Sequence, residues 1–143
     1  MELLVSPYAG IGEILLGQSV DQVRSIYTPS RGVPPTNDFT DYFKDIAVQI
    51  QYKDFEVVFI GITNPDIAKY QGVNLLEKTF GEIRNMLKAT DNNIYVEDGC
   101  SILYLDTGLC FYSDDMEDEN CPQQAAVFVK GYYDEILHLY KKY

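Results

Sequence analysis

An internal repeat is the feature that most constrains the fold of this chain. Residues 15–24 (LLGQSVDQVR) return sixty positions later as residues 75–84 (LLEKTFGEIR), and Gly12 is matched by Gly72. The matched positions are apolar residues, small polar residues suited to cap a helix, and glycines, all of which have structural explanations. The repeat therefore predicts a chain of two similar halves and names no chemistry.

The first half has the pattern of a strand, a helix and a hairpin. Residues 2–5 predict a short strand. Ser19 is a preferred helix N-cap, and the apolar spacing after it predicts a helix over 19–27. The prolines and glycine of 29–35 end that helix. Alternating apolar residues over 46–62 then predict a β-hairpin.

The second half repeats this order. Thr79 takes the capping position, and Glu82 three residues later completes the pattern of a capping box, so a helix is expected to begin here. Residues 94–96, 101–105 and 109–113 then predict strands, the last two joined by a tight turn.

The C-terminal part is expected to hold one more strand and a helix. Residues 124–130 have the composition of a strand. After them, an apolar stripe at helical spacing predicts a closing helix over about 131–142. The residues of this stripe are Tyr133, Ile136, Leu137 and Tyr140.

Together these elements predict an α+β fold. Two pseudo-repeats, at about 10–65 and 70–130, would each contribute a helix and an antiparallel β-hairpin to one shared sheet, and a C-terminal helix would close the fold. At 143 residues the chain is long enough to bury a core without disulfides or metals. We therefore expect a single domain over residues 1–143.

Composition and cysteine usage favour a reducing, aqueous compartment. Contents of 46% hydrophobic and 23% charged residues are those of a globular chain. The N-terminus lacks the basic and apolar regions of a signal peptide, and no stretch reaches the roughly 20 apolar residues needed to cross a bilayer. Three widely spaced cysteines, Cys100, Cys110 and Cys121, are typical of free thiols. We therefore expect a cytoplasmic protein.

Negative charge is concentrated in one segment. Residues 91–121 contain nine acidic residues and no Lys or Arg, and so carry −9 of the net charge of −11. Such a field repels nucleic acid and anionic lipid and attracts a basic surface. The plainer interpretation is a solvated face that only keeps the protein soluble. We expect no nucleic-acid and no membrane partner.

Tyrosine is the second compositional signal, because the chain has twelve tyrosines and no tryptophan. Tyr offers a large contact area and a polar tip at low ordering cost and is therefore enriched at interfaces, although strands also favour it in cores. Several tyrosines lie near the acidic segment. The predicted partner-binding residues are Asp114, Asp115, Glu117, Asp118, Glu119, Glu97, Asp98, Tyr95, Tyr104 and Tyr112.

Patterns for catalysis or metal binding are weak. His138 is the only histidine, and it lies between apolar neighbours. The cysteines lack the short spacing of zinc ligands. The acidic loop 114–120 lacks the central glycine and closing glutamate of a calcium-binding EF-hand. We expect no metal, no cofactor and no enzymatic activity.

One short motif and the tandem arrangement of the halves resemble known families. Leu16-Gly17-Gln18-Ser19 with Val23 downstream, followed by a proline-containing loop and strands, resembles the helix-entry motif of BamE-type outer-membrane lipoproteins. The tandem of helical segment plus sheet is similar to the β-lactamase inhibitor protein, whose two repeats place a concave sheet against a target. A lipobox cysteine is absent, so the resemblance implies architecture and protein binding rather than envelope assembly. In size and charge the chain also resembles bacterial immunity proteins, which neutralise a cognate toxin.

The sequence thus favours a non-catalytic protein that binds another protein. Its concrete form is an inhibitor or immunity-type protein, monomeric or weakly dimeric, whose acids and tyrosines contact a basic partner such as a toxin or an enzyme. The alternative is a small-molecule-binding or enzymatic domain with a pocket between sheet and helices, in which His138 or a cysteine would take part. A self-associating module is a third hypothesis, disfavoured by the net charge.

Overall fold

The fold consists mostly of β-strands, and only 17% of the chain is helical. The computed structural model describes residues 2–97 and 99–143. The helices are α1 (Val20–Ile26) and α2 (Phe80–Leu87), with short 3-10 turns η1 (Lys44–Ile46), η2 (Leu75–Glu77) and η3 (Leu137–Leu139). The strands are β1 (Leu3–Ser6), β2 (Gly10–Ile11), β3 (Ile14–Leu15), β4 (Phe39–Phe43), β5 (Val48–Lys53), β6 (Glu56–Ile62), β7 (Ala68–Tyr70), β8 (Val73–Asn74), β9 (Ile94–Glu97), β10 (Ser101–Tyr104), β11 (Leu109–Tyr112), β12 (Gln124–Phe128) and β13 (Lys141–Lys142).

These strands form two sheets. The larger sheet has eight strands in the order β13-β9-β10-β11-β12-β6-β5-β4, all antiparallel, and the smaller has five in the order β3-β2-β1-β7-β8. The two halves of the chain meet in the larger sheet where β12 pairs with β6, with Ala126 opposite Gly61. They meet in the smaller sheet where β1 and β7 pair in parallel. Both sheets therefore contain strands from each half.

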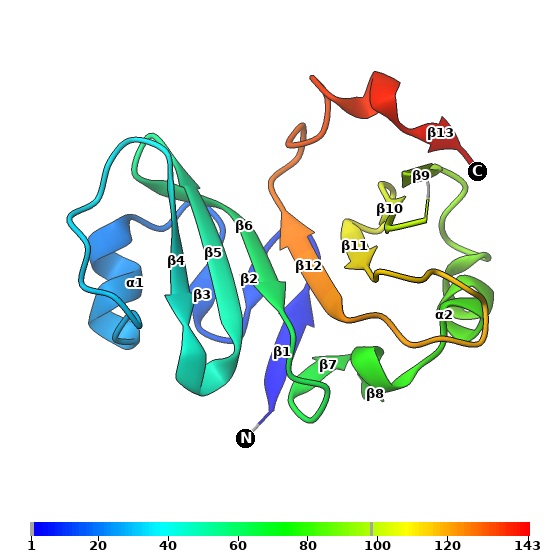
Figure 1. The fold of residues 1–143 in the computed structure, drawn as a ribbon, viewed down its shortest axis with the longest axis horizontal. Coiled ribbons are helices and arrows are strands. Elements are labelled where there is room, and N and C mark those ends of the chain that lie inside the picture. Colours follow the sequence, from blue (N-terminus) through cyan, green and yellow to red (C-terminus); the bar gives the residue numbers. More distant parts are fainter. Residues whose placement is uncertain (1, 98) are drawn as a thin grey trace.

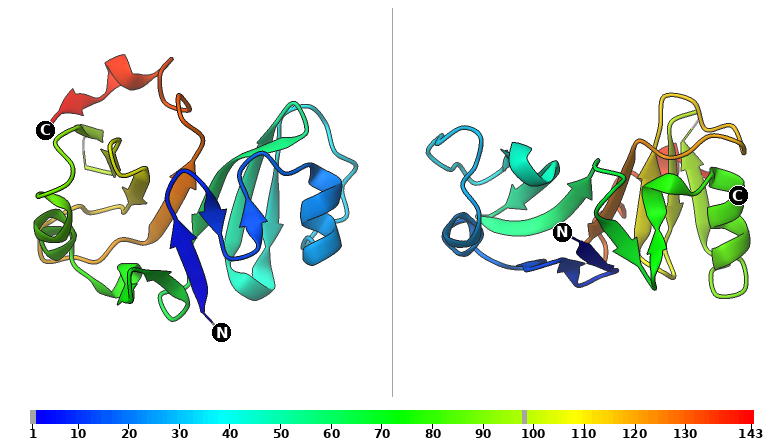
Figure 2. Two further views of the ribbon diagram at one scale, coloured as in Figure 1. Left: turned by 180° about the vertical axis from the view of Figure 1, so that it is seen from behind. Right: turned by 90° about the horizontal axis from the view of Figure 1, so that it is seen from below.

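One hydrophobic core joins the sheets and the helices. Val23 of α1 and Ile83 of α2 are fully buried and belong to the same cluster as Val5 of β1 and Ile60 of β6. The two helices lie at opposite ends of the molecule, α1 beside β4 and α2 beyond β11 (Figure 1). Seen from behind and from below, the larger sheet runs between them (Figure 2). The far ends of that sheet, at β4 and at β13, are thus well separated.

The predicted fold class is wrong. The chain does not form helix-plus-hairpin pseudo-repeats on one shared sheet, because it is mostly β and has two sheets of five and eight strands. Strands β2, β3 and β8 have two residues each, too few to produce an alternating pattern in the sequence. The first two of the three predicted helices and the strands β5, β6, β10 and β11 do lie where the sequence placed them.

The predicted closing helix over 131–142 is also wrong. Gly131 has a φ of +84°, and the segment continues through turns and the short η3 into β13. Its tyrosines instead cover the second face of the larger sheet. The ring of Tyr133 packs edge-on against Phe128 of β12, with the ring centroids 4.9 Å apart, and Tyr132 packs against Phe59 of β6. Packing of aromatic side chains on the sheet replaces the predicted helical stripe.

The repeat survives locally at the start of each helix. Ser19 and Thr79 accept hydrogen bonds from the N–H groups of Gln22 and Glu82, whose side chains in turn accept from the capping residues. Each pair is a complete capping box, as the sequence predicts for Thr79 and Glu82.

Removal of a cap should lower stability moderately. Thr79→Ala loses the oxygen that accepts the Glu82 N–H at 3.1 Å, so the free energy of unfolding should fall by about 1 kcal/mol. Thr79→Ser retains the oxygen and should remain near the unmodified protein. Urea unfolding measures both, and equal losses for the two variants would show that the hydroxyl oxygen does not stabilise the helix start.

Candidate functional site

Most of the predicted partner-binding acids line one open groove. Its volume is about 700 Å³, and Tyr143 and Met116 lie among the carboxylates. The acidic residues that line it are Glu97, Asp114, Asp115, Glu117, Asp118 and Glu119. We call this set, with Met116 and Tyr143, the acidic groove.

Strand register brings the two parts of the acidic groove together. Glu97 at the end of β9 lies opposite Ser101 of β10, and Ser101 lies opposite Tyr112 at the end of β11. The acidic loop that begins after Tyr112 therefore starts at the same end of the sheet as Glu97. Glu97 and the acids from Asp114 onward, 17 or more positions apart in the chain, thus share one surface because β10 lies between β9 and β11.

The acidic loop is held against the first turn of α2. The N–H groups of Phe80 and Gly81 donate to the carbonyls of Asn120 and Asp118, at 2.8 and 3.0 Å. A Cβ at Gly81 would stand 3.2 Å from the Asp118 carbonyl oxygen, so the glycine permits this close approach. The loop is therefore attached to the rest of the fold at several points.

Arg84 adds a side-chain clamp. Its two terminal nitrogens donate to the two carboxylate oxygens of Asp118 at 2.9 and 2.6 Å, and its guanidinium lies over the ring of Tyr143, 5.7 Å from the centroid. The pairing with Asp118 raises the pKa of Arg84 and lowers the pKa of Asp118. Arg84 therefore ties α2 to both the acidic loop and the C-terminal residue.

Most of the negative charge of the acidic groove is uncompensated. Among the residues that the structure describes, Asp118 is the one groove carboxylate in an ion pair. Asp114 accepts a hydrogen bond from the hydroxyl of Tyr112 at 2.9 Å, but this donor carries no charge. Five carboxylates therefore remain available to a cationic group.

The predicted tyrosines have different environments. Tyr112 is 40% exposed at the mouth of the acidic loop, and Tyr95 is half-buried with the ammonium of Lys142 4.7 Å from its ring centroid. Tyr104 is 1% exposed, and burial raises its pKa, so its prediction as a contact residue is wrong. Both faces of β10 are covered, and for this reason alternation in the sequence does not separate Tyr104 from surface tyrosines. Asp98 lies outside the described residues.

Sequence reasoning missed Tyr143, Met116 and Arg84. Tyr143 reaches the acidic groove because its N–H donates to the carbonyl of Ile94, the first residue of β9. No local pattern signals this pairing, since the two residues lie far apart in the chain. Arg84 carried a signal, because it stands at the position equivalent to Arg24, which also pairs with an aspartate, Asp41.

Loss of the clamp should loosen the acidic loop. In Arg84→Met, amides of 114–120 should exchange hydrogen faster, because the bidentate pair is gone while the aliphatic stem remains. Lys88→Met, on an exposed lysine at the end of the same helix, should leave the exchange unchanged. Hydrogen exchange with mass spectrometry measures both, and equal rates in the two variants would contradict the clamp.

The same clamp has a defined pH dependence. The pKa of Asp118 in the fold lies below the ordinary value of 3.8, so the pair is complete above that value and is lost as the pH falls through the lowered pKa.

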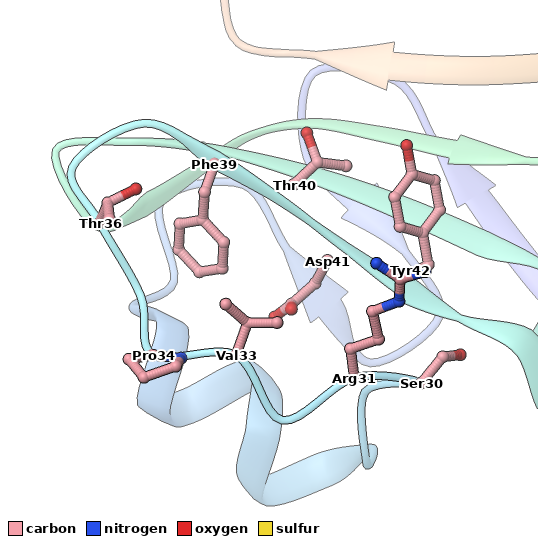
Figure 3. Close-up of a pocket in the computed structure, with 9 residues that line it drawn as sticks. All are labelled: Ser30, Arg31, Val33, Pro34, Thr36, Phe39, Thr40, Asp41 and Tyr42. Atoms are coloured by element: carbon pink, nitrogen blue, oxygen red, sulfur yellow. The ribbon is translucent and has the colours of Figure 1, made fainter.

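A second cavity, of about 530 Å³, lies between the loop 30–36 and β4 (Figure 3). The residues expected to serve a pocket lie elsewhere: His138 is exposed on η3, and Cys121 is exposed. Cys110 is buried, and burial raises the pKa of its thiol to about 11, so it is protonated at neutral pH.

Neither metal-ligand groups, nor membrane-spanning helices, nor similarity to known proteins assign a function to the chain. Within residues 2–97 and 99–143, no three His, Cys, Asp or Glu side chains are grouped as metal ligands, and no helix has the length and apolar character to span a membrane. Comparisons with protein families, curated proteins and solved structures found no match to the chain.

Proposed function

We propose that the protein binds a basic surface of another protein through the acidic groove, in the manner of an inhibitor or immunity-type protein that neutralises a toxin or an enzyme. The observation that carries the proposal is the set of five unpaired carboxylates, four of them on a loop tied to α2 and the fifth, Glu97, at the end of β9. A cationic partner could pair with these carboxylates directly, because no Lys or Arg of the described residues has to be displaced from them first.

The shape of the acidic groove favours a protein partner. It is open, and apolar contact area from Met116 and Tyr143 lies beside the acids. Tyr112 adds an exposed ring whose hydroxyl orients Asp114. Carboxylates for attraction and aromatic rings for contact area are the combination that protein interfaces use.

Two charge-matched variants test the proposal, each made by replacing four acids with amides. Both change the net charge from −11 to −7 by removing four negative charges. The groove variant carries Asp114→Asn, Asp115→Asn, Glu117→Gln and Glu119→Gln. The control variant carries Glu13→Gln, Asp54→Asn, Asp66→Asn and Glu135→Gln, four exposed sites outside the acidic groove.

The unmodified protein and both variants are immobilised and exposed to an extract of the native cell. We expect a basic protein to bind the unmodified protein and the control variant at low salt, to elute at high salt, and to be lost from the groove variant. Equal retention by the groove variant, or retention of acidic proteins alone, would refute the proposal.

A further inference from the structure

The cavity beside β4 lies at the end of the larger sheet opposite to the acidic groove. β4 is the last strand of that sheet, and β13 is the other edge. The loop 30–36 folds back along the free side of β4, and the cavity lies between them (Figure 3). One wall of the cavity is therefore the edge of a β-sheet.

The loop satisfies this edge at two points and leaves the middle open. The N–H of Ser30 donates to the carbonyl of Tyr42 at 2.8 Å, and the hydroxyl of Thr36 donates to the carbonyl of Asp38 at 3.2 Å. The Tyr42 carbonyl points away from β5. In an antiparallel pair, every second residue directs both its N–H and its C=O away from the neighbouring strand, so those of Thr40 also point away from β5 and toward the cavity. Among the described residues nothing on that side bonds to the Thr40 backbone.

The lining also offers apolar side chains and one free positive charge. Val33 and Phe39 extend into the space from opposite walls, and Arg31 extends from the loop toward Tyr42 (Figure 3). Arg31 forms no ion pair with any residue of 2–97 or 99–143. The carboxylate of Asp41 in the cavity floor already accepts from Arg24 and Tyr52. The unpaired charged group at this site is therefore the guanidinium of Arg31.

We propose that this cavity binds a short extended peptide segment that pairs with Thr40 through its backbone. One peptide residue exchanges both backbone hydrogen bonds with Thr40. The neighbouring peptide residue, whose side chain points to the opposite face, lies on Phe39 and Val33, and a carboxylate of the peptide pairs with Arg31. The site is separate from the acidic groove and independent of the function proposed for it.

The exposed edge distinguishes a peptide from a purely apolar ligand. A strand edge offers one N–H and one C=O from the same residue, and an extended backbone presents the matching pair at the same spacing. Ser30 and Thr36 occupy the carbonyls of Tyr42 and Asp38 on either side, so Thr40 is the residue between them whose N–H and carbonyl are both open. A short segment is therefore expected rather than a long added strand.

Variants at Thr40 separate backbone pairing from other effects. Thr40→Pro removes the N–H that faces the cavity, and proline is tolerated in an edge strand where the N–H points away from the sheet. Thr40→Val keeps the N–H and removes only the hydroxyl, so it is the matched control. Arg31→Gln removes the unpaired charge of the cavity.

The experiment selects a displayed library of random heptapeptides on the full-length protein. The most enriched peptide is synthesised with a free carboxylate, and its affinity is measured by calorimetry, with backbone amide shifts recorded by NMR. We expect binding to the unmodified protein and to Thr40→Val, shifts at Thr40 and Tyr42, and about tenfold weaker binding to Thr40→Pro, the loss of one backbone hydrogen bond.

Changes to the peptide leave the protein fold untouched. Methylating the peptide nitrogen that faces Thr40 should weaken binding about tenfold. Amidating the carboxylate should weaken binding to the unmodified protein but not to Arg31→Gln. The proposal is overturned if selection enriches no peptide, if N-methylation has no effect at any position, or if the enriched peptides shift amides outside 30–42. A small apolar molecule that binds Thr40→Pro equally well, with no peptide enriched, would also overturn it.

Discussion

Association of the groove variant with its captured basic partner should be at least about tenfold slower than association of the unmodified protein at low salt. The variant lacks four of the five unpaired carboxylates of the acidic groove, so the long-range attraction that guides encounter is removed. The four amides retain the acceptor oxygens that Tyr112 and the Glu117 N–H use, so the loop conformation should persist. Dissociation should change less than association.

Stopped-flow mixing at several salt concentrations measures this effect. The rate for the unmodified protein should fall steeply with salt, and the rate for the groove variant should be nearly flat. The control variant has the same net charge and should follow the unmodified protein. If both variants slow association equally, net charge rather than the acidic groove is responsible, and the groove assignment fails.

Asp41→Ala should lower the free energy of unfolding by about 3 kcal/mol, the largest loss expected here from a single polar substitution. Asp41 is 4% exposed and accepts from Arg24 at 2.9 and 3.0 Å and from the Tyr52 hydroxyl at 3.0 Å. This pairing raises the pKa of Arg24, and burial, followed by the charge of Asp41, raises the pKa of Tyr52. The alanine leaves both donors without their acceptor inside the protein.

The second arginine clamp is an internal control for this prediction. Arg84 and Asp118 also form a bidentate pair, through the two terminal nitrogens of Arg84 rather than through Nε and one terminal nitrogen as in Arg24, but Asp118 is 63% exposed. Water replaces the lost partner there, so Asp118→Ala should cost much less than Asp41→Ala. Urea unfolding compares the two variants directly. Equal losses would show that burial does not determine the strength of these pairs.

Local chemistry explains which parts of the fold the sequence predicted. The helix starts depend on neighbours three residues apart, Ser19 with Gln22 and Thr79 with Glu82, and these patterns are visible in the chain. The β5–β6 hairpin was similarly visible, because its strands are six and seven residues long and one alternates cleanly between buried and partly exposed positions.

Long-range contacts explain what the sequence could not predict. The ion pairs of Arg24 and Arg84 join residues 17 and 34 positions apart, and no spacing rule identifies their partners. The apolar spacing at 131–142 is that of a helix, but Tyr132 and Tyr133 of this segment pack instead on the rings of Phe59 and Phe128 of the larger sheet. Most acids of the groove are neighbours in the sequence and could be predicted as one group. The position of Tyr143 in the groove and the burial of Tyr104 depend on the tertiary fold and could not be predicted.

Hydrogen exchange of the complex tests the central claim most directly. The amides of the free protein are compared with those of the protein bound to its basic partner. We expect new protection over 113–120, at the end of β9 and at Tyr143, where the acidic groove lies. Unchanged exchange over 113–120, with protection gathered elsewhere on the molecule, would contradict the account.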